Sequence, residues 1–209
     1  MKSILFSCFF ILVLACNQAG EHQDHSAHQH AAPAKTSTAP KVSAAYADSV
    51  NRGLVADTIK GSPVRQTMTM LNGNHIHITY GSPGVRGRVI WGGLVAYDQV
   101  WVTGAHDATS VMFDKDVMIN NQKIPAGTYG FFTIPGKEEW TIILNKNYQQ
   151  HLADDYTDKE DVIRVKIKPE KQENITQRLT YKIEPSDEKS GNISMYWEYL
   201  KISLPFTTI

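Results

Sequence analysis

The side chains best suited to chemistry are concentrated between residues 81 and 109, a stretch with little regular hydrophobic alternation. Long irregular segments in a compact domain are uncommon and often functional. Guanidinium groups beside a glycine-rich turn can hold a carboxylate, a phosphate or a sugar acid. Aromatic rings can form a flat platform for a sugar ring or another ligand. The candidate ligand-binding residues are Arg86, Arg88, Trp91, Tyr97, Trp101, Thr103 and Thr109.

The same segment contains a possible catalytic pair, His106 and Asp107. The imidazole can act as a general base, and the carboxylate can orient it, as a hydrolase requires. The sequence contains no Gly-x-Ser-x-Gly, phosphate-loop, dinucleotide or His-Glu-x-x-His motif, so catalysis is the weaker hypothesis. The structural alternative is that Arg86 and Arg88 bind loop carbonyls and carboxylates while the tryptophans belong to the core.

Two further histidines, His75 and His77, are two positions apart in a predicted strand, so their side chains share one face. Together with a third ligand such as His106, they would form a zinc or copper site of the catalytic type. The alternative is an exposed sheet face with two solvated imidazoles. The apolar residues that alternate with these histidines predict that the opposite face lies in the core, which favours this alternative.

Four of the eight histidines fall in a polar segment rich in Ala, Gln, Ser, Thr and Pro. Imidazoles at this density can chelate Cu(II), Zn(II) or Ni(II) without a preformed fold. The alternative is a soluble tether without a metal. Copper and zinc are therefore the cofactors that the sequence suggests. These metal candidates are His22, His25, His28 and His30.

The N-terminus has the pattern of a bacterial lipoprotein signal. Lys2 precedes an apolar run that is too short for a mature membrane span, and the run ends at Leu14-Ala15-Cys16 before a polar segment. We predict cleavage before Cys16 and acylation of its sulfur, with palmitate or a similar chain anchoring the protein to a membrane. The expected location is the cell envelope, facing the periplasm or the cell surface. Cys8 would leave with the signal peptide, and the remaining chain has no other cysteine.

The chain divides into a signal peptide (1–15), a lipidated His-rich tether (16–45), an N-terminal extension (46–61) and one domain (62–209). In the domain, short β-branched and aromatic runs alternate with turn residues, which predicts an all-β antiparallel sandwich or barrel. The only helical candidate is 147–153. Lys and Arg number 21 and Asp and Glu number 21, so no net charge favours nucleic acid. The predicted strands are 65–71, 75–80, 110–119 with a break at 114–116, 128–134, 140–145, 162–168, 179–184, 193–200 and 201–207.

Residues 84–164 resemble the DUF2911 family of exported bacterial proteins. The resemblance is carried by Gly84-Val85-Arg86-Gly87-Arg88 and Trp91-Gly92-Gly93, Thr103-Gly104-Ala105, Ala126-Gly127-Thr128-Tyr129, Phe132-Thr133-Ile134-Pro135-Gly136 and Asp161-Val162-Ile163-Arg164. It implies an all-β domain and no established chemistry. The central motif departs from the family pattern, because Val102, His106 and Asp107 stand where the family tends to have arginine, an amide and glutamate.

Three functional hypotheses follow. The first is a membrane-tethered, non-enzymatic module that binds a small molecule or an envelope component through the 81–109 segment. The second is a metal-handling lipoprotein that uses the tether histidines and a folded histidine site. The third is an envelope hydrolase that uses His106 and Asp107.

Overall fold

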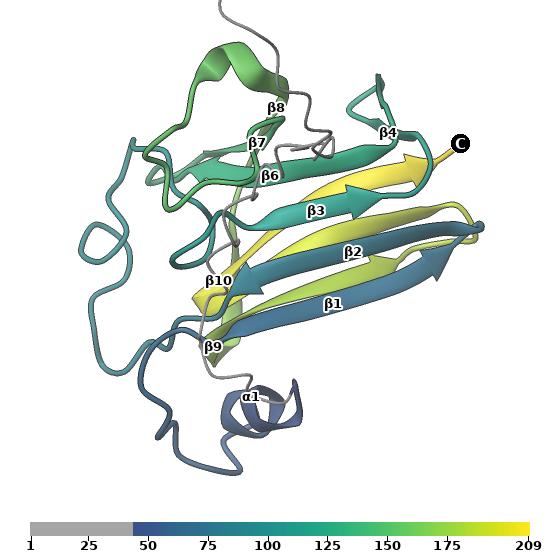
Figure 1. Ribbon diagram of the computed structural model, residues 1–209. Coiled ribbons are helices and arrows are strands. Elements are labelled where there is room, and N and C mark those ends of the chain that lie inside the picture. Colours follow the sequence, from purple (N-terminus) through teal and green to yellow (C-terminus); the bar gives the residue numbers. More distant parts are fainter. Residues whose placement is uncertain (1–43) are drawn as a thin grey trace, which may run out of the picture. The chain divides into compact units, whose positions relative to one another are not determined.

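The computed structural model describes residues 44–209, which form two antiparallel β-sheets and one short α-helix (Figure 1). The all-β fold class is therefore confirmed, and the arrangement is sandwich-like. The predictions for the signal peptide, Cys16 and the tether histidines lie outside the described residues. No helix in residues 44–209 is long and apolar enough to cross a membrane.

The larger sheet has six strands and begins with a tight hairpin. Its turn is Asn72-Gly73, with φ of 49° and 68°, and Gly73 adopts this left-handed backbone without steric penalty. The hairpin places residue 70 opposite residue 75 and residue 68 opposite residue 77. In spatial order the strands are β1 (Val64–Leu71), β2 (Asn74–Gly81), β3 (Ser110–Phe113), β6 (Gly127–Ile134), β7 (Trp140–Asn145) and β8 (Asp161–Ile167).

The smaller sheet is dominated by two long strands near the C-terminus. They pair in antiparallel fashion with register shifts around Glu198, whose φ of 54° marks a local bulge. In spatial order the strands are β5 (Gln122–Ile124), β4 (Val117–Ile119), β10 (Ser190–Thr208) and β9 (Glu170–Pro185).

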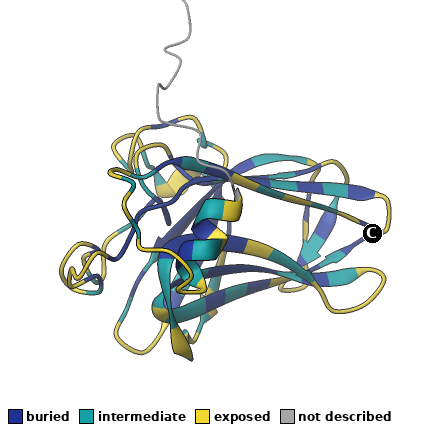
Figure 2. Ribbon diagram, turned by 90° about the horizontal axis from the view of Figure 1, so that it is seen from below, coloured by how far each residue is buried: buried dark blue, intermediate teal, exposed yellow. Residues whose placement is uncertain are grey.

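The core lies between the two sheets. Ile76 and Phe113 of the larger sheet and Leu204 of the smaller sheet belong to one continuous buried cluster. Buried and more exposed residues alternate along many strands (Figure 2), as expected when one face of each sheet is packed and the other meets solvent.

The helix α1 (Ala44–Asn51) and the segment after it pack against β9. Ala47 and Val50 are buried, and the Asn51 side chain bonds to both backbone groups of Arg178. Asn51 thus forms the two backbone hydrogen bonds at Arg178 that a neighbouring strand would otherwise form with β9. The extension predicted at 46–61 is therefore ordered against the domain.

Three sequence predictions need correction. Residues 147–153 form bends and turns and not a helix, and the one short 3₁₀ helix, η1 (Asp158–Glu160), lies further on. The predicted strands 193–200 and 201–207 are one continuous strand, β10, and β9 begins nine residues earlier than predicted (179 − 170). The helix α1 and the short strand β5 were not predicted.

Candidate functional site

All four tryptophans of the chain lie in one cluster, which we call the tryptophan cluster. Trp91 contacts Trp140 edge-on with ring centroids 4.9 Å apart, and Trp101 stacks on Trp197 at 5.8 Å. The Trp91 indole nitrogen donates to Glu198 Oε2 at 3.0 Å. Because the faces of the half-buried Trp91 and Trp101 rings are occupied by other rings, this geometry favours packing over a ligand platform.

Thr103 and Thr109 are completely buried and hold the same segment in shape. The Thr103 backbone is left-handed, with φ of 50°, and its carbonyl accepts hydrogen bonds from Thr109 Oγ1 at 3.1 Å and Tyr181 Oη at 2.9 Å. Its own hydroxyl lies 3.0 Å from Thr133 Oγ1. A ligand cannot reach these hydroxyls without opening the core.

Tyr97 is half-buried against the backbone of Gly92. A Cβ built at Gly92 would lie 2.8 Å from the Tyr97 ring, so this glycine makes room for it. The Gly92 φ of 76° also favours glycine at this position. The Tyr97 ring therefore supports the local turn.

The two arginines of the segment have different surroundings. Arg88 is exposed at the residue level, yet its guanidinium donates to the carbonyls of Gly84 and Val85 in its own loop. Arg86 is a third exposed, and its Nε lies 3.7 Å from Asp57 Oδ2. Only Arg86 therefore faces residues outside the 81–109 segment.

Asp57 is the centre of a buried ion pair that the sequence analysis missed. Its Oδ1 accepts from Arg178 Nε at 2.8 Å, and the Arg178 side chain is fully buried. The same guanidinium donates to the carbonyls of Ser82, Ile59 and Gly61. Arg178 thus fastens the segment after α1 onto the sandwich.

His106 and Asp107 are exposed and do not form an oriented pair. His106 has a left-handed backbone with φ of 65°, and its ring lies 6.5 Å from the His151 ring between centroids. Asp107 forms an isolated backbone bridge with His151. In the described part of the chain, no hydrogen bond joins the His106 ring to a carboxylate, as a general base held by an acid would need.

His75 and His77 share one face of β2, as their spacing predicts, with ring centroids 6.0 Å apart. His75 Nδ1 lies 3.8 Å from Asp114 Oδ2. The structure does not add His106 to this pair, because within residues 44–209 no group of three or more His, Cys, Asp or Glu is placed to hold a metal.

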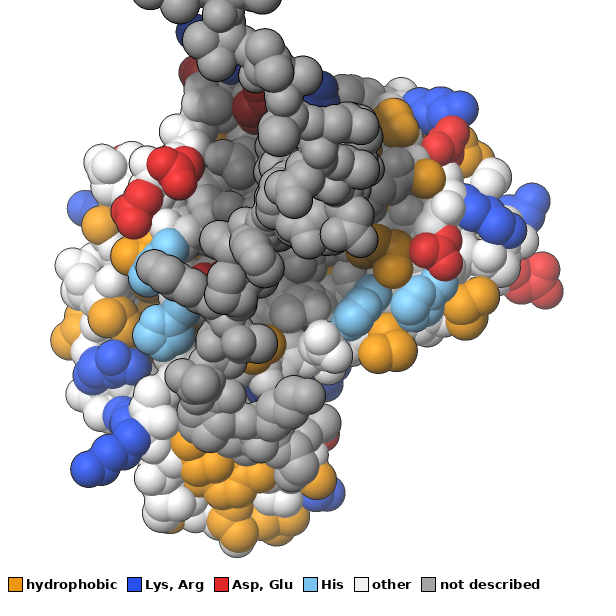
Figure 3. Space-filling view, in the orientation of Figure 1, with side chains coloured by type: hydrophobic (Ala, Val, Ile, Leu, Met, Phe, Trp, Pro, Cys, Tyr) orange, Lys and Arg blue, Asp and Glu red, His pale blue; other side chains and the backbone are white. Residues whose placement is uncertain are grey.

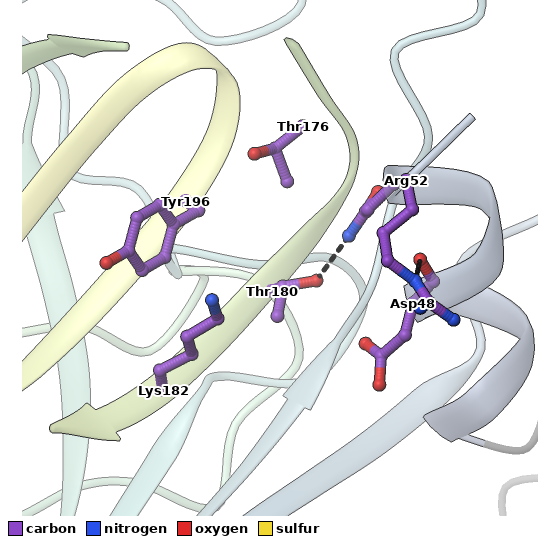
Figure 4. Close-up of a pocket in the computed structure, with 7 residues that line it drawn as sticks. Asp48, Arg52, Thr176, Thr180, Lys182 and Tyr196 are labelled. Atoms are coloured by element: carbon purple, nitrogen blue, oxygen red, sulfur yellow. Dashed lines mark hydrogen bonds between the residues drawn. The ribbon is translucent and has the colours of Figure 1, made fainter. Parts of the chain in front are cut away.

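The clearest concavity lies elsewhere, between α1, β9 and β10, and we call it the α1 hollow. Its volume is about 590 Å³, and in Figure 4 Asp48 and Arg52 extend from the helix opposite Lys182 and Tyr196. Two smaller hollows of about 530 and 400 Å³ continue along the helix and share lining residues with it or with each other. The α1 hollow is lined by Asp48, Asn51, Arg52, Thr176, Thr180, Lys182 and Tyr196.

The charges around the α1 hollow are unbalanced. Its single carboxylate, Asp48, is paired with the buried Arg65 at 3.3 Å. In the part of the chain that the structure describes, neither Arg52 nor Lys182 has a carboxylate partner within 4.0 Å. The Lys182 ammonium lies 4.9 Å from the Tyr196 ring centroid, a cation–π distance. Two cations that form no ion pair within 4.0 Å among the described residues therefore line the hollow.

Tyr196 and Glu184 form a hydrogen-bonded wall beside these cations, with Tyr196 Oη 2.8 Å from Glu184 Oε1. Burial and this carboxylate raise the pKa of Tyr196 far above its usual value, so the phenol stays neutral. Burial alone would raise the pKa of Glu184, but hydrogen bonds from Ser194 and Tyr196 and the nearby lysine charges lower it overall. Beside the cations, Glu184 is therefore an ionised carboxylate and Tyr196 a neutral phenol.

A family model described as a protein of unknown function (DUF2911) matches residues 62–206. The chain belongs to the DUF2911 family. No curated protein and no solved structure matches it. The resemblance read from the sequence is thereby confirmed, over a longer stretch than its motifs covered.

The α1 hollow is only partly made by the DUF2911 domain. Thr176, Thr180, Lys182 and Tyr196 lie inside the matched segment, whereas the residues from α1 precede it. The wall on β9 and β10 therefore lies inside the matched segment, and the helical wall lies outside it.

Sequence reasoning missed most residues that the structure brings together around α1. No local pattern connects residue 57 with residue 178, since their contact spans 121 positions. The signal for α1 was also weak, because eight residues form a marginal helix unless tertiary packing supports them. One signal was available, however, since the alternation around the Asn72-Gly73 turn already fixes which side chains of β1 face those of β2.

Proposed function

We propose that this protein is a membrane-tethered lipoprotein of the cell envelope whose DUF2911 domain is a non-enzymatic binding module. Acylation of Cys16 would anchor it, and residues 16–45 would act as the tether. The α1 hollow would bind a small anionic molecule, such as a carboxylate, a phosphate or a sugar acid. The observation that carries this proposal is the pair of unpaired cations, Arg52 and Lys182, in a hollow of about 590 Å³.

Electrostatics support an anionic ligand. Arg52 on the helical side and Lys182 on β9 line the same hollow (Figure 4). The Arg52 Nε donates to the Asp48 carbonyl at 3.4 Å, which leaves its terminal nitrogens and the Lys182 ammonium to donate charge-assisted hydrogen bonds to an anion. The Asp48 carboxylate does not oppose such a ligand strongly, because Arg65 neutralises it. A hollow of this size is within the range of small-molecule sites, about 300–1,000 Å³.

The chemistry of the hollow supports binding over catalysis. Thr180 Oγ1 already accepts from Asn51 and Arg65 and donates to the Arg178 carbonyl. Tyr196 keeps its proton because its pKa is raised, so it is no general base. In this proposal the 81–109 segment supports the fold, and Arg86 alone extends toward the neighbouring hollow near Asp57.

Isothermal titration tests the ligand class. Citrate, inorganic phosphate and galacturonate are titrated into the full chain, and at least one should bind saturably, with affinity falling as salt screens the charges. Arg52→Gln and Lys182→Gln should each weaken that binding about tenfold. The control Lys189→Gln removes an exposed lysine outside the hollow and should leave binding unchanged. Absence of saturable binding by all three anions, or equal effects of all three substitutions, would refute the ligand class.

Mass spectrometry of the membrane fraction tests the anchor. The mature protein should begin at Cys16 and carry acyl chains, and Cys16→Ser should abolish acylation and leave the signal peptide attached. An N-terminus before Cys16, or an unmodified cysteine, would refute the lipoprotein assignment and leave the binding proposal intact.

A further inference from the structure

The solvent-facing side of β1, β2 and β3 carries three methionines and two histidines in register. Met70 lies opposite His75, and His77 lies between Met68 on one side and Met112 on the other. Directly opposed residues of antiparallel strands have Cβ atoms about 4.5–5.5 Å apart and share one face. We call these five residues the Met–His face, and Figure 3 shows histidine side chains beside hydrophobic ones in this part of the molecule.

Two of the three methionines of this face are largely exposed, and Met112 is half-buried. Met68 is 57% exposed and Met70 is 63% exposed, whereas their strand neighbour Leu71 is buried. Core packing therefore does not explain why methionine occupies these positions, because the core lies on the other side of the sheet. Exposed thioethers are also vulnerable to sulfoxide formation.

His77 provides an independent observation. Its Nε2 atom is buried, yet within the described residues it has no hydrogen-bond partner. Buried imidazole nitrogens normally find a donor or acceptor, so an unpartnered one requires an explanation. Here the unpartnered nitrogen belongs to the residue that has a thioether on each side. A ligand bound by all three side chains would satisfy it.

The donor set selects the ligand. Thioether sulfur is a soft ligand that favours Cu(I), and imidazole is compatible with it, whereas Zn(II) sites use thiolate, imidazole and carboxylate donors. The described residues offer no cluster of three such donors. We propose that the Met–His face binds a soft monovalent ion, Cu(I) or Ag(I), through His77 Nε2 and the sulfurs of Met68 and Met112.

The second pair of the face, Met70 and His75, would hold the edge of this site. His75 Nδ1 lies 3.8 Å from Asp114 Oδ2, too far for a hydrogen bond, so this carboxylate does not fix the ring. The ring centroids of His75 and His77 are 6.0 Å apart, so His75 can supply a further ligand after a small rotation. This site is separate from the α1 hollow and shares no lining residue with it.

The test measures Cu(I) and Ag(I) binding by the full chain in detergent. Cys8 and Cys16 are changed to Ser and the tether histidines to Gln, so that the Met–His face is the remaining soft site under test. Anaerobic competition with bicinchoninate should show one Cu(I) per chain. Ag(I) should shift the methionine methyl signals of Met68 and Met112 in carbon-13 NMR spectra.

Substitutions at the face decide the assignment. Met68→Leu combined with Met112→Leu keeps apolar bulk, removes both sulfurs and should weaken Cu(I) binding by at least about tenfold, since losing even an outer-shell partner of a metal costs about 10–100-fold. His77→Gln should do the same. Met118→Leu on β4 is the matched control and should have no effect.

Three results would overturn the proposal. They are no Cu(I) retained against bicinchoninate, an unchanged affinity in the Met68→Leu/Met112→Leu variant, and displacement of Ag(I) by an equal concentration of Zn(II). A fourth result would also overturn it, namely that the face binds no metal and instead pairs two chains through its exposed methionines. Such a dimer would persist in the Met68→Leu variant and be lost in the Met68→Asp variant.

Discussion

Replacing Arg178 with Met should strongly destabilise the protein, because it breaks a buried ion pair. The Arg178 side chain is fully buried, and its partner Asp57 is 9% exposed. The substitution removes the closest counter-ion of the Asp57 carboxylate, which keeps only the longer contact with Arg86 Nε at 3.7 Å. It also removes the donor to the Ser82 and Ile59 carbonyls. Removing one partner of a buried pair costs about 3–5 kcal/mol, and we expect a loss in this range.

The unpaired Ser82 and Ile59 carbonyls should lower the free energy of unfolding by less than the sum of two fully buried, unsatisfied groups. Residues 57–61 lie outside the two sheets, so we expect that local opening of this extension would let water reach the unpaired groups without unfolding the sheets. A domain of this kind typically has about 5–15 kcal/mol of stability, so the variant should still fold. Hydrogen exchange in residues 44–61 should then increase more than exchange in β6 or β7.

Urea denaturation followed by tryptophan fluorescence measures the loss. The double variant Asp57→Asn/Arg178→Met should be more stable than the sum of the single effects predicts, by about 0.5–3 kcal/mol, since it removes both charges. Lys166→Met serves as the control, because it breaks an exposed ion pair with Glu139 and should leave the urea midpoint unchanged. A loss below about 1 kcal/mol for Arg178→Met, or strict additivity in the double variant, would refute this reasoning.

Three further predictions concern the core and one tyrosine. Trp140→Ala removes a buried member of the tryptophan cluster and should lower the free energy of unfolding by about 3–5 kcal/mol in urea; a loss below about 1 kcal/mol would contradict its core role. Gly81→Ala would drive a Cβ into the Ala105 carbonyl and should cost about 1–3 kcal/mol; an unchanged melting temperature would show that the loop yields freely. Burial and the Asp161 carboxylate raise the pKa of Tyr156 from 10.0 to about 12, so this stabilising contribution is present below pH 10 and is lost as pH rises toward about 12. An ultraviolet titration should show one late-ionising phenol that Tyr156→Phe removes and Asp161→Asn shifts to lower pH, and an early-ionising Tyr156 would contradict this pKa.

Much of the sandwich followed from local sequence patterns. Alternation of apolar and polar residues located β1, β2, β6 and β7 to within one residue at each end. The break predicted at 114–116 does separate β3 from β4. These predictions succeeded because strand periodicity and turn residues act over a few neighbouring positions.

The wrong helix at 147–153 shows where local reasoning failed. The backbone of this segment bonds to distant residues: Ala108 N–H donates to the Gln150 carbonyl, and Leu152 N–H donates to the His106 carbonyl. Leu152 also has a left-handed backbone with φ of 51°. Tertiary hydrogen bonds therefore overrode a weak helical preference.

For the candidate sites too, local spacing predicted some features and only the fold revealed others. The spacing of His75 and His77 correctly placed them on one face, and the register of the Asn72-Gly73 hairpin adds Met68 and Met70 to that face. The ligand candidates in 81–109 had the right residue types for binding. Their burial and mutual contacts, visible only in the fold, assigned Trp91, Trp101, Thr103 and Thr109 to packing.

The sequence by itself determined the all-β class, the family, the turns and the facing of side chains within each hairpin, because these depend on interactions between near neighbours. Only the tertiary structure joined Asp57 to Arg178, collected the four tryptophans and formed the α1 hollow. Contacts of this kind connect residues far apart in the chain, and many pairings are compatible with the same local pattern. Packing of the two sheets against each other, with every buried charge requiring a partner, selects among them.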